Sequence, residues 1–221
     1  MAPRRRPDQP DTRTLLVETG LRLFRERGYD RTTMRLIASE AGVSVGNAYY
    51  WFPGKDHLVQ ELYRRLQVEH RAAVADRLPL GGTLEQRLRG TWLAGLEVFA
   101  PYRSFGTGFV QVALRPGDGA SPFSEASAEA RRLAVDLLTE VVEGARPPVQ
   151  GPAAERLPEL LWLAWLGVTL FWVHDGSPDA ARSRRLVERS VPLVARLVRL
   201  SRLPVLRGTV QDVLDLVDEV T

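Results

Sequence analysis

Two short helical segments between Thr33 and Phe52, separated by Gly42, constrain the fold of this 221-residue chain more than any other feature. Each spans only about eight residues, and a helix of that length is not stable alone in water. A third helix must therefore cover their apolar sides. The apolar spacing over residues 12–27, which ends at Gly28, predicts this supporting helix.

Polar residues at helix starts and a glycine at the turn define the limits of the two short helices. Thr32 or Thr33 can cap the first and Ser44 the second, while Gly42 makes the turn. Two helices joined by so short a turn have the geometry of a helix-turn-helix. We expect the core of this unit to contain Leu16, Leu23, Phe24, Ile37, Ala38, Ala41, Val43, Ala48 and Phe52.

The second short helix then presents residues that are unusual for a solvated helix surface. Gly46 inside a helix costs roughly 1 kcal/mol relative to Ala, which is consistent with close approach of a partner to the backbone. Asn47 can form paired hydrogen bonds with adenine, and Val45 can contact a thymine methyl group. Hydroxyl groups at helix starts suit phosphates. The residues expected to face outward are Ser44, Val45, Gly46, Asn47, Tyr49, Tyr50 and Trp51.

Charge gives a local rather than a global indication of nucleic-acid binding. The formal net charge is only +3. The only lysine, Lys55, lies in the first turn of a predicted helix over residues 55–78, where a cation opposes the helix dipole by about 0.3–1 kcal/mol and a phosphate would reverse that sign. Simpler interpretations remain: Lys55 pairs with Asp56, Gly46 permits close helix packing, and Tyr49 is core. Basic residues gather near the motif: Arg4, Arg5, Arg6, Arg13, Arg22, Arg25, Arg27, Arg31 and Arg35.

Composition limits the class of protein. Hydrophobic residues make up 44% and charged residues 26%, the balance of a soluble globular chain, and there is no cysteine for disulfides or thiolate metal sites. The N-terminus lacks the pattern of a secretory signal, and the apolar run from Leu160 to Val173 is shorter than a membrane span. We therefore expect a cytoplasmic, bacterial protein without a membrane partner.

Proline, glycine and capping residues divide the chain into helices. We expect a disordered basic arm over residues 1–10, a helix-turn-helix domain over 11–54 and a larger helical domain over 55–221, with helix 55–78 connecting the two domains. Thr83 and Gln86 form a capping box, and Ser121-Pro122 and Ser177-Pro178 read as helix starts. The further helices are predicted over residues 83–100, 101–114, 121–144, 153–175, 178–202 and 209–220.

Residues 12–60 resemble the tetracycline-repressor (TetR) family of bacterial transcriptional regulators. The resemblance implies an all-α homodimer, with an N-terminal three-helix DNA-binding domain for a palindromic double-stranded operator and a larger helical ligand-binding and dimerisation domain. By position, it implies that Thr33, Arg35, Ser44, Tyr49, Trp51 and Lys55 hold phosphates or base edges, with Val45, Gly46 and Asn47 at the recognition surface. Ala48 and Trp51 depart from the usual residues at their positions. The matching residues are Thr33, Ile37, Ala38, Ala41, Gly42, Val43, Ser44, Gly46, Tyr49, Phe52, Lys55 and Leu58.

The remainder of the chain is rich in aromatic residues, which suggest either a pocket for a small, largely apolar effector or plain core. Two consecutive apolar segments, Leu157 to Trp172 and Leu186 to Leu200, are expected to form a four-helix dimer interface. No cofactor, metal ligand set or catalytic group is expected. The candidate ligand-binding residues are Trp92, Phe99, Tyr102, Phe105, Phe109, Trp162 and Trp165.

The sequence is compatible with three kinds of function. The first is a repressor released from its operator by an effector. The second is an effector-free DNA-binding or structural dimer. An activator is also compatible with the motif, since the direction of regulation depends on where the operator lies. The third, an enzyme using the aromatic region, is disfavoured because His57, His70 and His174 are scattered without a nucleophile–base or metal-ligand spacing.

Overall fold

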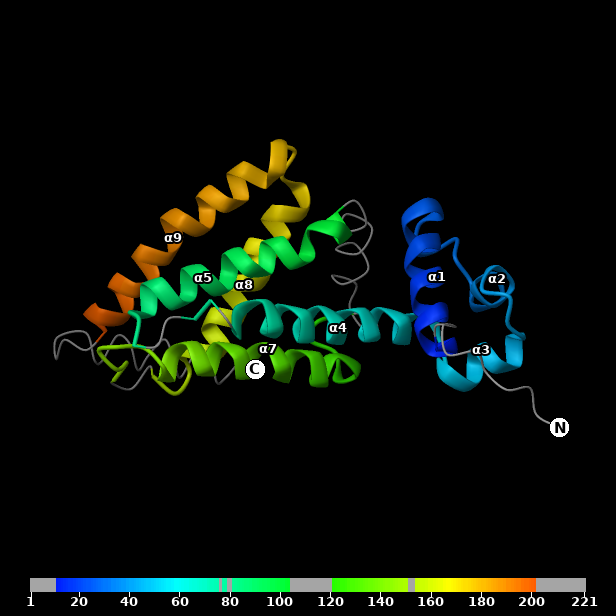
Figure 1. Ribbon diagram of the computed structural model, residues 1–221, viewed down its shortest axis with the longest axis horizontal. Coiled ribbons are helices and arrows are strands. Elements are labelled where there is room, and N and C mark those ends of the chain that lie inside the picture. Colours follow the sequence, from blue (N-terminus) through cyan, green and yellow to red (C-terminus); the bar gives the residue numbers. More distant parts are fainter. Residues whose placement is uncertain (1–10, 76, 79–80, 104–120, 151–153, 202–221) are drawn as a thin grey trace. The chain divides into compact units, whose positions relative to one another are not determined.

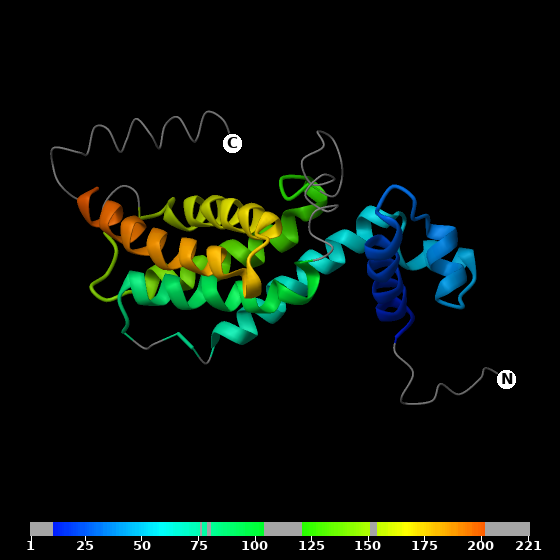
Figure 2. The ribbon, with the colours of Figure 1, turned by 90° about the horizontal axis from the view of Figure 1, so that it is seen from above.

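The computed structural model describes residues 11–75, 77–78, 81–103, 121–150 and 154–201 (Figures 1 and 2). All regular secondary structure in these ranges is helical, which confirms the predicted fold class. The chain divides into two packing units: residues 1–65 with 104–130, and residues 66–103 with 131–221. Helices α4 (Lys55–Ala75) and α7 (Ala128–Glu143) contribute to both units, and the division between the units falls inside each of them.

The first unit contains three helices, α1 (Thr12–Arg27), α2 (Met34–Glu40) and α3 (Val45–Trp51), shown in blue and cyan in Figure 1. Helices α2 and α3 form the helix-turn-helix, and α1 supports them. The Thr33 hydroxyl accepts a hydrogen bond from the backbone N–H of Leu36 at 3.2 Å, and the Ser44 hydroxyl accepts one from that of Asn47 at 3.1 Å. Gly42 makes the turn with a φ of +66°, a backbone conformation that favours glycine. Both predicted caps and the turn are thus confirmed, with Thr33 rather than Thr32 as the cap.

The core of the three helices follows the predicted apolar pattern closely. Ala41 and Val43 are only partly buried, because they lie at the turn between α2 and α3. Ala48 is fully buried despite its small side chain, so α3 packs close to its neighbours at this point. The predicted core residues found buried are Leu16, Leu23, Phe24, Ile37, Ala38, Ala48 and Phe52.

The second unit is built around α5 (Leu84–Phe99), α8 (Leu157–His174) and α9 (Ala181–Leu200), which pack against one another and lie side by side in Figure 2. The capping box of Thr83 and Gln86 is present at the start of α5, as predicted. The last turns of α4 join this unit through Val74, which packs with Ala94 of α5 and Leu137 of α7.

Two predicted helices begin later than their proline signals indicate. The helix expected from Ser121 begins at Ala128, after a 3-10 turn η2 (Glu125–Ser127) that the Ser124 hydroxyl caps by accepting from the Ser127 N–H. The helix expected from residue 178 begins at Ala181, after η3 (Pro178–Ala180), because Asp179 and Ala180 have positive φ angles that interrupt a right-handed helix.

The remaining limits differ less. Helix α4 ends at Ala75 rather than 78, and α8 begins at Leu157 rather than 153. Of the predicted helix 101–114, the described part forms the 3-10 turn η1 (Ala100–Tyr102). The rest of that helix, the arm over residues 1–10 and the helix over 209–220 lie outside the described residues.

Helix α8, 18 residues long, is apolar enough to cross a membrane by length and composition alone, and 39% of it is buried. The apolar run read from the sequence, Leu160 to Val173, falls short of this limit because it omits the first turn. Since α8 packs against both α5 and α9, we interpret it as a core helix with one exposed apolar side.

Candidate nucleic-acid interface

Helix α3 carries one buried and one open face. Ala48 points into the core, while Tyr50 is 79% exposed and Tyr49 48% exposed. The rings of Tyr50 and Trp51 pack edge to face, with centroids 5.5 Å apart. The predicted outward face of α3 is confirmed: Ser44, Val45, Gly46, Asn47, Tyr49, Tyr50 and Trp51 are all exposed.

Gly46 lies in the middle of this exposed face. A Cβ atom added there would meet nothing within 4 Å, so packing inside the chain does not require glycine. The interpretation that Gly46 permits close helix packing is therefore wrong. A residue that costs helix stability and relieves no internal clash is consistent with a surface that a partner approaches closely.

The starts of α2 and α3 each carry an exposed hydroxyl group, on Thr33 and Ser44. The Thr33 and Ser44 hydroxyls accept hydrogen bonds from their own helices, and each retains a proton that can be donated to a phosphate oxygen. Arg35 is exposed on the first turn of α2. These groups provide the neutral and cationic donors that commonly hold a DNA backbone.

Lys55, at the start of α4, has a partner inside the protein. Its ammonium group donates to the Tyr29 carbonyl oxygen at 2.7 Å and lies 4.0 Å from the centre of the Tyr29 ring. Asp56, the neighbour expected to pair with it, is 3.5 Å from the Nδ1 atom of His57. Lys55 thus ties α4 to the loop between α1 and α2, and the side chain is half-buried.

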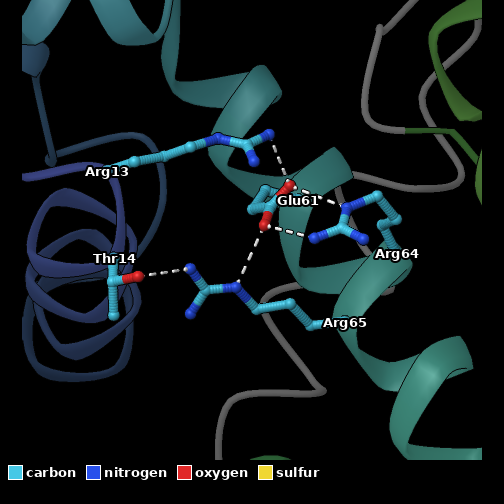
Figure 3. A network of polar contacts seen from close by, with 5 residues as sticks. All are labelled: Arg13, Thr14, Glu61, Arg64 and Arg65. Atoms are coloured by element: carbon cyan, nitrogen blue, oxygen red, sulfur yellow. Dashed lines mark hydrogen bonds and ion pairs between the residues drawn. The ribbon is translucent and has the colours of Figure 1, made fainter. Parts of the chain in front are cut away.

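A buried carboxylate joins α1 to α4 (Figure 3). Glu61, 5% exposed, accepts hydrogen bonds from Arg13 of α1 at 2.8 Å and from Arg64 and Arg65 of its own helix at 3.0–3.1 Å. Burial alone would raise the pKa of Glu61, but the hydrogen bonds from Arg64 and Arg65 and the charge of Arg13 outweigh it and hold the pKa below its usual value. The carboxylate therefore stays ionised and fixes α1 on α4.

Arg13, which binds Glu61, also contacts Phe52 at the end of α3. Its guanidinium carbon lies 5.8 Å from the centre of the Phe52 ring, on the same side chain that reaches Glu61. A shallow cleft in the first unit opens beside this contact. The cleft is lined by Arg13, Trp51, Phe52, His57, Gln60, Glu61, Arg64, Ala126, Glu129 and Ala130.

Three of the predicted ligand-binding residues meet in the second unit. Trp165 of α8 lies with its ring centroid 6.0 Å from that of Trp92 and 5.8 Å from that of Phe99, both on α5. His70 of α4 completes this group at 5.8 Å from Trp165, and we call these four residues the aromatic cluster. Trp162 is buried on α8 and Tyr102 is partly exposed, whereas Phe105 and Phe109 lie outside the described residues.

Comparison with known families decides what kind of protein carries this interface. Residues 87–219 match the family model described as "Tetracyclin repressor-like, C-terminal domain", and residues 16–62 match "Bacterial regulatory proteins, tetR family". The chain belongs to the tetracycline-repressor family. It is therefore a DNA-binding transcriptional regulator with an N-terminal helix-turn-helix, as its sequence predicted.

Relatives of the chain include transcriptional repressors. The chain is 26% identical over 172 residues to the transcriptional repressor KstR2 of Mycobacterium tuberculosis, covering 76% of this chain and 84% of that one. It is 28% identical over 181 residues to KstR2 of Mycolicibacterium smegmatis, covering 79% and 86%.

Solved structures of family members have the same fold. The TetR transcriptional regulator from Nitrosomonas europaea superposes with a TM-score of 0.64 at 18% identity, over 84% of this chain and 99% of that one. Thermus thermophilus FadR, a TetR-family repressor in complex with lauroyl-CoA, gives 0.62 at 22% identity, over 81% and 92%. At these identities the likeness concerns the fold.

The sequence reasoning missed the residues that hold the DNA-binding domain together. Glu61, Arg64 and Arg65 are spaced for contact on one helix, and this spacing was a usable signal. The partnership of Glu61 with Arg13, 48 residues earlier, has no local signal. The contact of Lys55 with Tyr29 has no local signal either. Both contacts could be recognised only in the tertiary structure.

Proposed function

We propose that this protein is a homodimeric repressor that binds a palindromic operator in double-stranded DNA and is released from it by a small, largely apolar effector. The observation that carries the proposal is the open face of α3, on which Gly46 relieves no internal clash and Asn47 is exposed. Family membership supplies the DNA-binding role. The repressor relatives favour repression over activation.

On DNA, the residues take distinct roles. Val45, Gly46 and Asn47 enter the major groove, where Asn47 pairs with adenine and Val45 meets a thymine methyl group. Thr33, Ser44 and Arg35 hold phosphates from the starts of α2 and α3. Tyr49, Tyr50 and Trp51 flank the groove at the end of α3. Lys55 adds positive charge near the backbone while it stays bound to Tyr29.

A second copy of the chain covers the exposed apolar side of α8 and α9. Phe171 of α8 is 44% exposed, and Leu193 and Leu197 of α9 are 60% and 65% exposed. These two helices contact each other within one protomer, and we infer that their exposed apolar residues form one surface. Isologous pairing of that surface buries it and sets two recognition helices on successive major grooves, about 34–36 Å apart.

Effector binding changes how well the two α3 helices of the dimer fit successive major grooves of the operator. The lauroyl-CoA of T. thermophilus FadR is a ligand of that protein. For the present chain, the aromatic cluster offers the apolar surroundings that a small effector requires. A ligand that binds better to the DNA-incompetent arrangement lowers operator affinity by its differential affinity for the two arrangements. Such a regulator works in the cytoplasm, where bacterial promoters are.

In vitro transcription tests the direction of regulation. Genomic fragments retained by the purified protein are cloned with their promoters upstream of a reporter, and the protein is titrated in. We expect the amount of transcript to fall as the protein occupies the fragment. The Asn47→Ala variant, which should bind the operator less well, should reach the same fall only at a higher protein concentration. A rise in transcript would identify an activator. Turnover of a small molecule without any retained DNA would favour the enzyme alternative.

A further inference from the structure

Two buried polar atoms of the aromatic cluster have no hydrogen-bond partner in the described part of the chain. They are Nδ1 of His70, a residue 3% exposed, and Nε1 of Trp92, a residue 1% exposed. Leaving such a group unpaired is destabilising, so native proteins rarely do so without a reason. Both rings flank Trp165, which brings an unpaired acceptor and an unpaired donor into one cluster.

The hydrogen bond on the other side of the imidazole fixes which kind of group is missing. His70 Nε2 lies 2.8 Å from the Thr91 carbonyl oxygen, and a carbonyl only accepts, so Nε2 carries the proton. Nδ1 of a neutral ring is then an acceptor that requires a donor. The indole N–H of Trp92 is a donor that requires an acceptor.

Burial keeps this imidazole neutral. Desolvation lowers the pKa of His70 below its usual value, although the hydrogen bond to the Thr91 carbonyl acts in the opposite direction. A neutral ring with a lone pair at Nδ1 repels a carboxylate and gains nothing from an ester or ether, which offer acceptors only. A hydroxyl group supplies both a donor and an acceptor.

The aromatic rings around His70 determine the polarity of the rest of the ligand. Phe99 and Trp165 present ring edges and faces to His70 at centroid distances of 5.8–5.9 Å, which favours an apolar frame. Gly95 of α5 is required here, because a Cβ atom would lie 2.7 Å from Trp165 and 3.0 Å from His70. The absence of a side chain at Gly95 lets the Trp165 and His70 rings pack close to the backbone of α5.

We propose that the aromatic cluster binds an uncharged, largely apolar molecule through a hydroxyl group that donates to His70 Nδ1 and accepts from Trp92 Nε1. This inference rests on the ligand-responsive role proposed above and names the chemical class of the effector. The ligand would contact α4 through His70. The same helix carries Lys55 and Glu61 of the DNA-binding unit in its first turns.

Six probes separate the hydroxyl from its alternatives on two apolar frames: 1-decanol, 1-methoxydecane and decanoate, and 2-naphthol, 2-methoxynaphthalene and 2-naphthoate. Titration calorimetry with the full chain gives the dissociation constants. On at least one frame we expect the alcohol to bind at least tenfold more tightly than the ether and the carboxylate, the factor of about one buried hydrogen bond. If neither alcohol binds better than its ether, the proposal is wrong.

A matched pair of variants tests His70 itself. His70→Gln keeps a donor towards Thr91 and loses the acceptor at the Nδ1 position, so the alcohol should bind about tenfold more weakly. His70→Asn keeps an acceptor at that position and should retain most of the affinity. Equal affinity of wild type and His70→Gln would overturn the assignment. Should the variants fail to fold, nitrogen NMR of the wild-type histidines decides, since the alcohol must shift the His70 Nδ1 resonance and the ether must not.

Operator binding measured on the same preparation keeps the two proposals separate. A protein that selects specific DNA but does not distinguish alcohols from ethers lacks this site and remains a regulator. A protein that binds the alcohol through His70 but selects no DNA retains the site and contradicts the proposed function.

Discussion

The ammonium group of Lys55 lies 2.7 Å from the carbonyl oxygen of Tyr29 and 4.0 Å from the centre of the Tyr29 ring. The single lysine of the chain thus holds the loop between α1 and α2 and carries its charge at the start of the helix that follows α3. These two roles can be separated by mutation, because a change at Tyr29 removes the ring contact and a change at Lys55 removes the charge.

Lys55→Met removes the charge and keeps the apolar stem. We expect it to weaken binding to specific and random DNA about equally and to lower the slope of log affinity against log salt by about 1. Tyr29→Leu, the control, removes the ring and leaves both the charge and the carbonyl. Its salt slope should equal that of wild type in fluorescence-anisotropy titrations. An unchanged slope in Lys55→Met would confine the lysine to its structural role.

Gly46→Ala should separate stability from DNA binding. The added methyl group meets no atom of the chain within 4 Å, so thermal unfolding should show a gain of roughly 0.5–1 kcal/mol from helix propensity. Operator affinity should fall, because the methyl group occupies the face that approaches the DNA. Gly90→Ala in α5 is a matched control, with equally open space around the new atom and no expected effect on DNA. Undiminished operator affinity in Gly46→Ala would remove this face from the interface.

Asn47→Ala should alter base preference rather than general affinity. An exposed asparagine amide can form two hydrogen bonds with one adenine, a contact worth about 1–3 kcal/mol of discrimination. Competition titrations against operators varied at one position per half-site measure the change. Equal losses of affinity for operator and random DNA would show that Asn47 does not read a base.

Leu197→Asp tests the homodimer. This leucine is 65% exposed on α9, and a carboxylate there would be buried unpaired in the proposed interface. Light scattering should give a monomer, whereas Arg185→Asp, which changes an exposed charge on the same helix, should leave a dimer. A dimeric Leu197→Asp protein would place the interface elsewhere.

Asp175 should make the protein sensitive to acid. Its carboxylate, 4% exposed, accepts hydrogen bonds from the N–H and hydroxyl groups of Ser177 and Ser183 at 2.6–3.0 Å. Burial would raise the pKa of Asp175, but these hydrogen bonds outweigh it and hold the pKa well below its usual value. Since the folded pKa is lowered, the stabilisation is complete above the unfolded pKa of about 3.9 and is lost as the pH falls further.

Asp175→Asn measures that contribution, because an amide cannot accept all four hydrogen bonds. We expect a loss of about 2 kcal/mol in the free energy of unfolding at pH 7. The difference from wild type should narrow in denaturant titrations below pH 4. A constant difference across this range would mean that the carboxylate charge is not what stabilises the turn between α8 and α9.

Local signals in the sequence were sufficient for the DNA-binding helices. Thr33, Gly42 and Ser44 act within three or four residues of chain, so their roles can be read without the fold. Local signals failed where neighbouring polar groups compete with a helix start. Ser121-Pro122 reads as a cap, yet the Ser124 hydroxyl closes a separate turn and delays α7 to Ala128.

Long-range pairings were beyond the sequence. Nothing near Arg13 indicates Glu61, and nothing near His70 indicates that α5 and α8 surround it with Trp92, Phe99 and Trp165. The aromatic residues were recognised by type alone, which could not show that Trp92, Phe99 and Trp165 meet. Packing of α4 against α5 and α8 supplies that information.

Selection of bound fragments from random duplex DNA, followed by sequencing, tests the central claim most directly. The purified dimer should enrich one palindromic sequence whose half-sites are about one helical turn apart, matching two α3 helices related by a twofold axis. If the dimer enriches no sequence even at low salt, where phosphate contacts are strongest, then the exposed face of α3 does not read DNA, which contradicts the proposed function.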